Sequence, residues 1–349
     1  MPLDYIISCT FLSIYIFVRA LLAASIQGED AGLQFLRFLQ YDIVQAFMKN
    51  YKHATRLQSP TQGNNMSVTK VLAALCLAAI IAPAFAEDTF KVCADPLNPP
   101  YSTKNKDGFE NKIAELFAKE LGQKVEYTWF AQRIGFIRNT LTAPVNERDV
   151  DSDKFKCDIV MGVPAGYDLT LTTAPYYKST YVLLIAKGRG WDDIKDAAQL
   201  SELPLQRQEA LKIAMFDRGP GTTWLQQNGL LDQGIPYQSM SGDSENNVAM
   251  EMDRDLKAKK IDMVILWGPV AAYVTAQSPK NSYTLIPMKS TPGLKFDFAM
   301  AMGVRNGDKA RKAALDKLIA TKADKIQAII ASYHIPLLPI TKEDGRGDD

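Results

Sequence analysis

The fold of this chain is decided by residues 90–130, which read FKVCADPLNPPYSTKNKDGFENKIAELFAKELGQKVEYTWF. Phe90–Ala94 is a short apolar run typical of a buried strand. Phe109–Leu121 has apolar residues at helical spacing and is followed by Gly122, a residue that commonly ends helices. Val125–Phe130 is the next predicted strand. The segment therefore predicts a strand–helix–strand unit, from which parallel sheets covered by helices on both faces are built.

The same alternation continues along the chain and starts again after the strongly apolar strand Tyr181–Ala186. This restart predicts a second α/β unit. The further predicted helices are Arg133–Leu141, Asp193–Leu200, Thr222–Asn228, Ser244–Ala258 and one long helix over Asp308–Tyr333. The further predicted strands are Asp158–Val163, Leu211–Phe216, Ile261–Leu266, Tyr283–Met288 and Phe296–Arg305.

Residues 66–86 read MSVTKVLAALCLAAIIAPAFA, the layout of a cleaved secretory signal. Lys70 precedes an apolar run that is too short for a membrane span, and the segment ends in small residues on either side of a phenylalanine. We therefore expect a periplasmic protein whose mature chain begins at Glu87 and has no stable membrane span. Residues 1–65 are expected to be absent from the native protein, and a membrane anchor in that segment is the alternative.

The charge balance excludes several classes of function. The chain has 40 Lys+Arg against 39 Asp+Glu, and without residues 1–86 the balance is 34 against 35. Such a chain has no basic domain of the kind that binds nucleic acid. Its only histidine beyond residue 86 is His334, so no familiar zinc site or Ser-His-Asp triad can be assembled. We accordingly predict no metal, no cofactor and no enzymatic activity.

Three motifs occur one after another along the chain: DPLNPPY at 95–101, TAPYYKSTYVLLIAKG at 173–188 and KIDMVILWGPVAAY at 260–273. Together with the predicted signal peptide they resemble the type II periplasmic solute-binding proteins. This resemblance covers residues 90–335 and implies two α/β lobes joined by two crossover strands, with a ligand cleft between the lobes.

The resemblance also implies the division of the chain. Lobe I would comprise residues 87–182 plus 288–340, and lobe II residues 183–287. Residues 341–349 would be a polar tail. Lobe I would thus be discontinuous, built from both ends of the mature chain.

Five segments carry a closer resemblance: VCADP (92–96), GFENKIAELFAKELG (108–122), YTWFAQRIGFIRNTL (127–141), CDIVMGVPAGYD (157–168) and TTAPYYKSTYVLL (172–184). They resemble the MxaJ/XoxJ proteins, which are encoded beside bacterial methanol dehydrogenases. The resemblance implies a periplasmic accessory protein of PQQ-dependent methanol oxidation, with methanol dehydrogenase as its partner. The alternative is the substrate-binding protein of an ABC importer for a small ligand that is not an amino acid.

Candidate cleft residues follow the predicted strands, because ligands of open α/β sheets bind beyond the carboxyl ends of the strands. These candidates are Asp95, Tyr101, Gly162, Val163, Pro164, Tyr167, Arg218, Gly221, Thr222, Thr223 and Trp267. The segment RGPGTT at 218–223 combines glycines that permit close backbone approach with a helix start that favours an anion. An ordinary strand-to-helix turn explains the same residues equally well.

Two charged residues that bind the ligand in amino-acid-binding relatives have no counterpart in this chain. The resemblance places an Arg for the ligand carboxylate near Gly166 and Tyr167, and an Asp for the ligand ammonium at Trp267. Neither charge is present, so amino-acid capture is not expected. Tyr101, Tyr167 and Trp267 suggest instead a cleft with aromatic walls for a flat or apolar ligand. Packing of these rings between the lobes is the alternative, and it is favoured.

Cys93 and Cys157 lie on strands expected to be neighbours, and exported proteins often contain disulfides. Cys93 is near the carboxyl end of its strand, whereas Cys157 is at the amino end of the other. An offset of three or four residues at about 3.3 Å each is about 10 Å, beyond the roughly 7 Å between Cα atoms that a disulfide tolerates. We therefore disfavour a Cys93–Cys157 disulfide.

Arg133 and Arg138 are the candidates for docking to a partner protein. Arginine is enriched where binding energy concentrates in interfaces. The two residues are five positions apart and so do not share one helical face. A solvated surface position explains them equally well.

Overall fold

The computed structural model describes residues 89–146, 148, 154–239, 242–243 and 245–344. All of these residues belong to one compact unit, which spans residues 85–349. The predicted extension at 1–65 and the predicted signal at 66–86 lie outside the described residues, as does the end of the predicted tail. Among the described residues, no helix combines the length and apolar character needed to cross a membrane.

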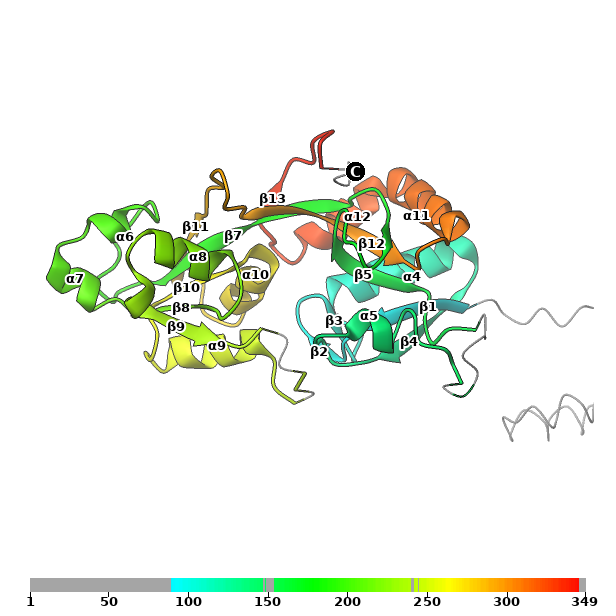
Figure 1. Cartoon of the computed structure of the whole chain (residues 1–349), viewed down its shortest axis with the longest axis horizontal. Helices are drawn as coiled ribbons and strands as arrows, with labels where there is room; N and C mark the ends of the chain where they lie inside the picture. The colour runs from blue at the N-terminus through cyan, green and yellow to red at the C-terminus, as the bar shows by residue number, and fades with distance from the viewer. Residues whose placement is uncertain (1–88, 147, 149–153, 240–241, 244, 345–349) are drawn as a thin grey trace, which may run out of the picture. The chain divides into compact units, whose positions relative to one another are not determined.

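One mixed sheet runs through the described part of residues 85–349, in the strand order β4–β1–β5–β12–β7–β10–β8–β9 (Figure 1). Strand β7 (Tyr177–Ala186) belongs to both halves, since it pairs with β12 at its start and with β10 and β11 further along. The first half-sheet contains β4 (Lys124–Trp129), β1 (Thr89–Ala94), β5 (Ile159–Pro164), β6 (Leu171–Thr172), β12 (Asp297–Val304) and β13 (Leu337–Leu338). The second half-sheet contains β10 (Met263–Trp267), β8 (Ile213–Phe216), β9 (Gly234–Tyr237) and β11 (Tyr283–Pro287).

The expected α/β fold class is confirmed, and the predicted strand–helix–strand unit is β1, α4 (Phe109–Leu121) and β4. Strand β1 lies between β4 and β5 and is parallel to both. The sheet becomes mixed where β12 pairs antiparallel with β5 and β7 pairs antiparallel with β10. Two further short strands, β2 (Leu97–Asn98) and β3 (Ser102–Thr103), form a separate antiparallel pair.

Helices cover both faces of the first half-sheet. Successive residues of β1 point to opposite faces, so that Phe90 and Val92 pack in the cluster that contains α4, whereas Cys93 packs with α5. The other helices are α5 (Phe136–Asn139), α6 (Gln199–Glu202), α7 (Leu205–Glu209), α8 (Pro220–Gln227), the 3₁₀ helix η1 (Leu231–Gln233), α9 (Val248–Lys257), α10 (Gly268–Ala276), α11 (Lys309–Thr321) and α12 (Ala323–Ala331).

The single helix predicted over Asp308–Tyr333 is wrong, because the chain bends at Lys322 and forms α11 and α12 instead. Lys322 has φ −115° and lies between the two helices. Its ammonium group pairs with the Glu120 carboxylate on α4 at 2.5 Å. Helix α11 packs on β12 and α12 packs on α4, so the bend lets one amphipathic segment cover two different neighbours.

The disulfide disfavoured from the sequence is formed: Cys93 is bonded to Cys157, with their Cα atoms 5.4 Å apart. The expected offset is present, since Cys93 lies opposite Val160 in the parallel register. The distance inferred from that offset was wrong because the chain leaves the line of β1 before Asp158, whose amide still donates to the Lys91 carbonyl at 2.9 Å. The Lys156 carbonyl accepts a hydrogen bond of 2.6 Å from the Thr128 hydroxyl on β4. This segment therefore crosses over β1 and brings Cys157 onto the face to which Cys93 points.

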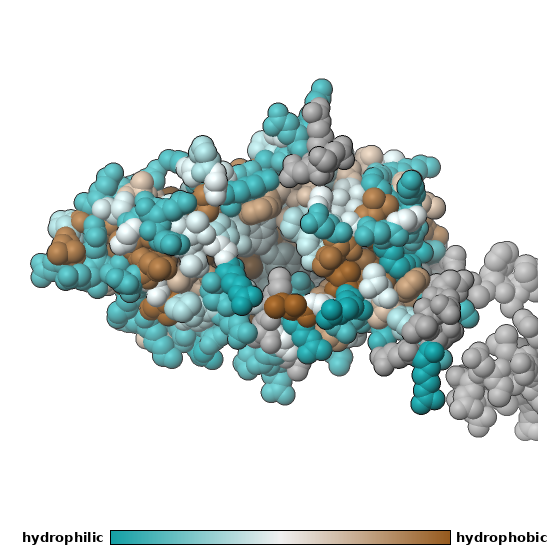
Figure 2. All heavy atoms as spheres, viewed as in Figure 1, coloured by the Kyte–Doolittle hydropathy of each residue, from teal (hydrophilic) through white to brown (hydrophobic). Residues whose placement is uncertain are grey.

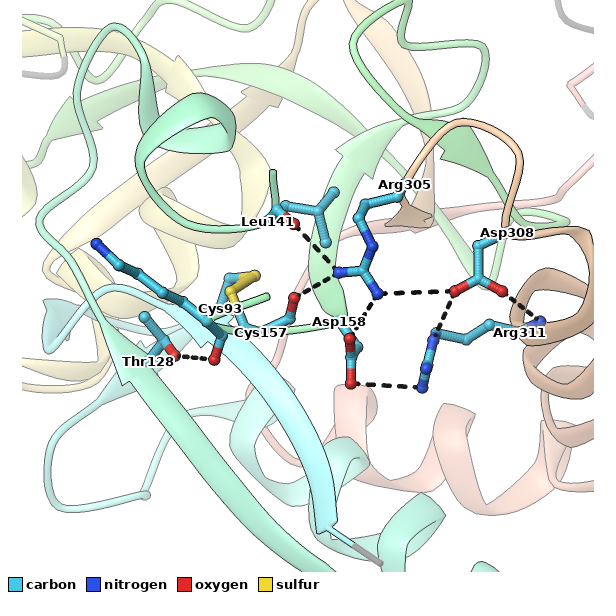
Figure 3. A network of polar contacts seen from close by, with 9 residues as sticks. Cys93, Thr128, Leu141, Cys157, Asp158, Arg305, Asp308 and Arg311 are labelled. Carbon is cyan, nitrogen blue, oxygen red and sulfur yellow. Dashed lines mark hydrogen bonds and ion pairs between the residues drawn. A yellow bond between two sulfur atoms is a disulfide. The ribbon is translucent and has the colours of Figure 1, made fainter. Parts of the chain in front are cut away.

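Arg305, the residue after β12, holds this crossing segment in place (Figure 3). Its guanidinium donates to the Cys157 carbonyl at 2.7 Å and to the Leu141 carbonyl at 3.1 Å. The same group pairs with Asp158 at 2.6 Å, with both side chains only about one-sixth exposed. The route that makes the disulfide possible thus depends on a contact 147 residues further along the chain.

Candidate functional site

A cavity of about 270 Å³ lies between the two half-sheets. Its walls come from the carboxyl ends of β1, β5, β8 and β10, from the start of α4, and from the segment that precedes α9. This is the position at which open α/β sheets bind ligands. The surrounding surface is mostly hydrophilic, with hydrophobic residues in separate groups on both halves (Figure 2).

Four of the predicted cleft residues line the cavity, namely Asp95, Tyr101, Gly162 and Trp267. Asp95 follows β1 and Trp267 ends β10, as the strand-end rule requires, whereas Gly162 lies within β5 and Tyr101 lies between β2 and β3. The remaining candidates do not line it; they are Val163, Pro164, Tyr167, Arg218, Gly221, Thr222 and Thr223. Val163 and Tyr167 instead pack in the cluster around the disulfide.

The RGPGTT segment forms the turn between β8 and α8. The Thr222 hydroxyl donates to the Phe216 carbonyl at 2.6 Å, which ties the start of α8 to the end of β8. A Cβ atom on Gly221 would lie 3.0 Å from the side chain of Ile265, so glycine here permits close packing of the helix on the sheet. Phe216 lines the cavity, whereas the six residues of the segment do not.

Asp95 holds the loops at the cavity in position. Its two carboxylate oxygens accept hydrogen bonds from the amide of Leu97 at 2.7 Å and from the amide of Gln132 at 2.6 Å. Its carbonyl accepts a further bond from the Ser102 hydroxyl at 2.8 Å. The side chain is 7% exposed. Both carboxylate oxygens are therefore engaged by backbone amides, which positions the residue as a structural anchor of the cavity.

Glu110, the second residue of α4, lines the cavity although the sequence analysis did not select it. An acidic side chain in the first turn of a helix is usually read as a favourable partner of the helix dipole, so nothing in the sequence marked it. Its carboxyl lies against Gly162, where a Cβ atom would be 2.2 Å from Oε1. No described residue donates a hydrogen bond to this carboxyl. Burial raises the pKa of Glu110 to about 8, so the group is mostly protonated at neutral pH.

Aromatic rings surround Glu110. Tyr101 and Trp267 line the cavity, and Trp267 also packs against Tyr181 and Phe298 at ring distances of 5.3 and 5.8 Å. Burial raises the pKa of Tyr101 well above its usual value, and the nearby Tyr177 and Glu110 add to the effect. These rings therefore serve both as a wall of the cavity and as packing between the half-sheets.

The opposite wall is polar and includes residues from the segment before α9. Asn247 caps α9, since its side-chain oxygen accepts from the Ala249 amide at 2.8 Å. Its side-chain nitrogen donates to the Leu97 carbonyl at 3.1 Å and to the Asn98 side chain at 3.3 Å. One residue thereby fixes a helix start and joins the two walls of the cavity.

The two arginines predicted for docking are both exposed and lie at different places. The Arg133 guanidinium lies over the Phe130 ring at 4.6 Å, and its side chain would touch a Cβ atom on Gly242, a cavity-lining residue. Arg138 is on α5, with its guanidinium beside Gly135. Arg133 therefore contacts the cavity-lining segment, while Arg138 does not line the cavity; their docking role stays a prediction.

The described residues of the cavity form no grouping suited to a metal or to anion binding. Among the described residues, no set of three or more His, Cys, Asp or Glu side chains could hold a metal ion. The described lining contains three carboxyl groups, those of Asp95, Glu110 and Asp243, and contains no Lys, Arg or His. An anionic ligand would find no opposite charge in these walls.

Comparison with known proteins gives relatives over most of the chain, while no family model matches. Protein MoxJ of Methylorubrum extorquens is 30% identical over 305 aligned residues, which cover 79% of this chain and 96% of MoxJ. The crystal structure of the periplasmic binding protein XoxJ from Methylobacterium extorquens AM1 has 31% identity and a TM-score of 0.56, and the match covers 72% of this chain and 100% of XoxJ. MxaJ from Methylophaga aminisulfidivorans MPT shares the fold at 22% identity and a TM-score of 0.58, over 71% of this chain and all of MxaJ. The expected type II periplasmic-binding-protein fold is thereby confirmed.

Proposed function

Because the chain belongs to the MoxJ family of periplasmic binding proteins associated with methanol oxidation, we propose that it is a non-catalytic accessory protein of PQQ-dependent methanol dehydrogenase. It acts in the periplasm and assists the maturation or the activity of the dehydrogenase, which is its partner. The observation that carries this proposal is the 30% identity to MoxJ over 96% of that protein's length. The binding-protein name of XoxJ and the predicted signal peptide at 66–86 support the periplasmic location.

The arrangement of the cavity supports a non-catalytic role. General acid–base catalysis needs a side chain that can exchange a proton with a bound substrate at the operating pH. Both carboxylate oxygens of Asp95 are engaged by backbone amides. Glu110 lies near the aromatic side chains of Tyr101 and Tyr177 and has no hydrogen-bonded base beside it among the described residues. The third carboxyl group of the described lining, that of Asp243, accepts from the amides of Glu245 and Asn246, so the described walls offer no second member of an acid–base pair.

The proposal is tested in a methylotroph whose own gene for this protein is deleted. Methanol dehydrogenase purified from the deletion strain is expected to have lower activity per mole of enzyme, and the plasmid-borne full chain is expected to restore it. The tagged protein, isolated from the periplasm with a mature start at Glu87, should retain the dehydrogenase. Equal specific activity with and without the protein, together with no retained dehydrogenase, would show the proposal to be wrong.

A second candidate function is that of a solute receptor for an ABC importer. The observation that favours it is the cavity between the half-sheets, across which Asn247 joins the start of α9 to β2. In that case the deletion strain would lose uptake of one solute while its dehydrogenase kept full specific activity. Measuring dehydrogenase specific activity and solute uptake in the same deletion strain therefore distinguishes the two functions.

A further inference from the structure

The charges in the walls of the cavity determine which ligands it can accept. Its described lining has carboxyl groups and no cationic side chain. Burying an anion there would cost desolvation energy without a compensating partner, whereas a cation would meet an opposite charge. The walls therefore select against carboxylates and phosphates and in favour of cations or neutral molecules.

Among the three carboxyl groups of the lining, Glu110 is the one placed to meet a ligand. Asp95 is engaged by the amides of Leu97 and Gln132, and Asp243 accepts from the amides of Glu245 and Asn246. Glu110 accepts no hydrogen bond from any described residue and lines the cavity directly. Gly162 gives it room, since any larger residue would occupy the space of its Oε1 atom.

The surroundings of Glu110 suit an organic cation better than a metal ion. A metal would need several oxygen ligands around one point, and the described residues offer no such group. Tyr101 and Trp267 instead present aromatic rings to the cavity, and the faces of such rings attract alkylated ammonium groups. The volume of about 270 Å³ lies just below the range of roughly 300–1,000 Å³ typical of sites for drug-sized ligands, which suits a small ligand.

We propose that the cavity binds a small alkylammonium ion, which pairs with the Glu110 carboxylate and is covered by Tyr101 and Trp267. This inference goes beyond the accessory role and does not depend on it, because the site lies within a single chain. Glu110 gives up its proton when the cation binds, since the ion pair favours the charged carboxylate. The titratable groups that face Glu110 from the adjoining elements are Tyr101, Tyr127, Tyr176 and Tyr177. Burial raises the pKa of Tyr127 to about 12 and holds the pKa values of the other three well above 10, so all four stay neutral and do not compete in the physiological range.

The test uses the protein exported to and purified from the periplasm, titrated calorimetrically with four probes at pH 7. These are n-butylammonium, tetramethylammonium, n-butanol and butyrate. We expect at least one of the two cations to bind at least tenfold more tightly than butanol and butyrate. Repeating the titration in buffers of different ionisation enthalpy should show release of up to one proton per bound cation. Equal or tighter binding of butanol or butyrate, or binding of neither cation at 10 mM, would overturn the proposal.

Two variants assign the effect to Glu110. Glu110→Gln removes the charge and should weaken cation binding at least tenfold and abolish the proton release. Glu115→Gln removes a carboxylate from the exposed face of the same helix and should leave both quantities unchanged. Unchanged cation affinity in Glu110→Gln contradicts the assignment. If that variant does not fold, the comparison of cations with butanol and butyrate on the unaltered protein still decides the proposal.

Discussion

At the scale of single residues, Glu110 makes the stability of the fold depend on pH. Burial raises its pKa from 4.5 to about 8 in the folded protein. The unfolded chain therefore releases this proton near pH 4.5 and the folded protein only near pH 8. The contribution of Glu110 to stability is fully present below pH 4.5 and is lost as the pH rises through 8, with a slope of up to about 1.4 kcal/mol per pH unit.

Glu110→Gln should remove that slope, because the amide cannot ionise and resembles the protonated acid. The free energy of unfolding of the variant, relative to the unaltered protein, is expected to increase steadily from pH 5 to pH 8. Urea unfolding at four pH values measures this difference, and Glu115→Gln serves as the control on the same helix. A constant difference across this range would mean that Glu110 ionises normally in the folded state.

Arg305 is the second residue whose removal should be costly. Its guanidinium binds two carbonyl oxygens and the Asp158 carboxylate, all of which would lose this partner in Arg305→Met. Removing one member of a mostly buried pair costs about 3 kcal/mol in unfolding free energy. Lys289→Met breaks the exposed pair with Asp196 and should cost less than about 1 kcal/mol. Urea unfolding of both variants compares them; similar losses would show that the Arg305 contacts stabilise no more than a surface pair.

At the scale of secondary-structure elements, Asn247 connects the start of α9 to β2. Asn247→Asp keeps the oxygen that caps α9, because Asp is as good an N-cap as Asn, but it loses the donor to the Leu97 carbonyl. The amides of the β2–β3 hairpin should then exchange hydrogen several-fold faster, while those of α9 keep their protection. Hydrogen exchange followed by mass spectrometry measures both.

Asn247→Ala is the matched comparison, since it loses the cap as well as the donor. In that variant α9 should also lose protection, by about 1 kcal/mol for the lost cap. Unchanged exchange of the hairpin in both variants would show that the bridge between the walls does not restrain β2.

Elements that depend on local sequence were predicted well. Helix α4 spans the predicted residues Phe109–Leu121, because its apolar spacing and the glycine after it are local signals. The predicted helix over Asp193–Leu200 reduces to a short α6 over Gln199–Glu202, and the bend at Lys322 was missed. The bend places α12 against α4, where Lys322 pairs with Glu120, about 200 residues earlier in the chain, and no local pattern reveals such tertiary contacts.

The residues of the candidate site also fall into those that the sequence predicts and those that depend on tertiary packing. Asp95, Tyr101, Gly162 and Trp267 were found because strand ends can be recognised from the sequence. Glu110 was missed because it stands at a helix start and meets the cavity only through tertiary packing. The disulfide was misjudged for a related reason, since the route of the residues before Ile159 depends on contacts with β4 and with Arg305.

At the scale of the whole molecule, the two half-sheets are joined too closely to unfold separately. Strand β7 pairs with β12 over Tyr177–Thr180 and with β10 over Tyr181–Ile185. Each half-sheet would therefore lose backbone hydrogen bonds if β7 left it. A single hydrophobic cluster also contains residues of both halves, among them Phe109 of α4 and Leu266 of β10. Loss of either half would expose apolar surface of the other.

We therefore expect residues 85–349 to unfold in one cooperative step, although many proteins of two α/β units do not. Pulsed hydrogen exchange at increasing urea, read by mass spectrometry, should give the same midpoint for peptides from α4 and from α10. Cooperativity requires that both peptides show the same fractions of protected and exchanged molecules at each urea concentration. Earlier loss of protection in α10 than in α4 would show that β7 and the shared cluster do not couple the halves, and that each half-sheet has a stability of its own.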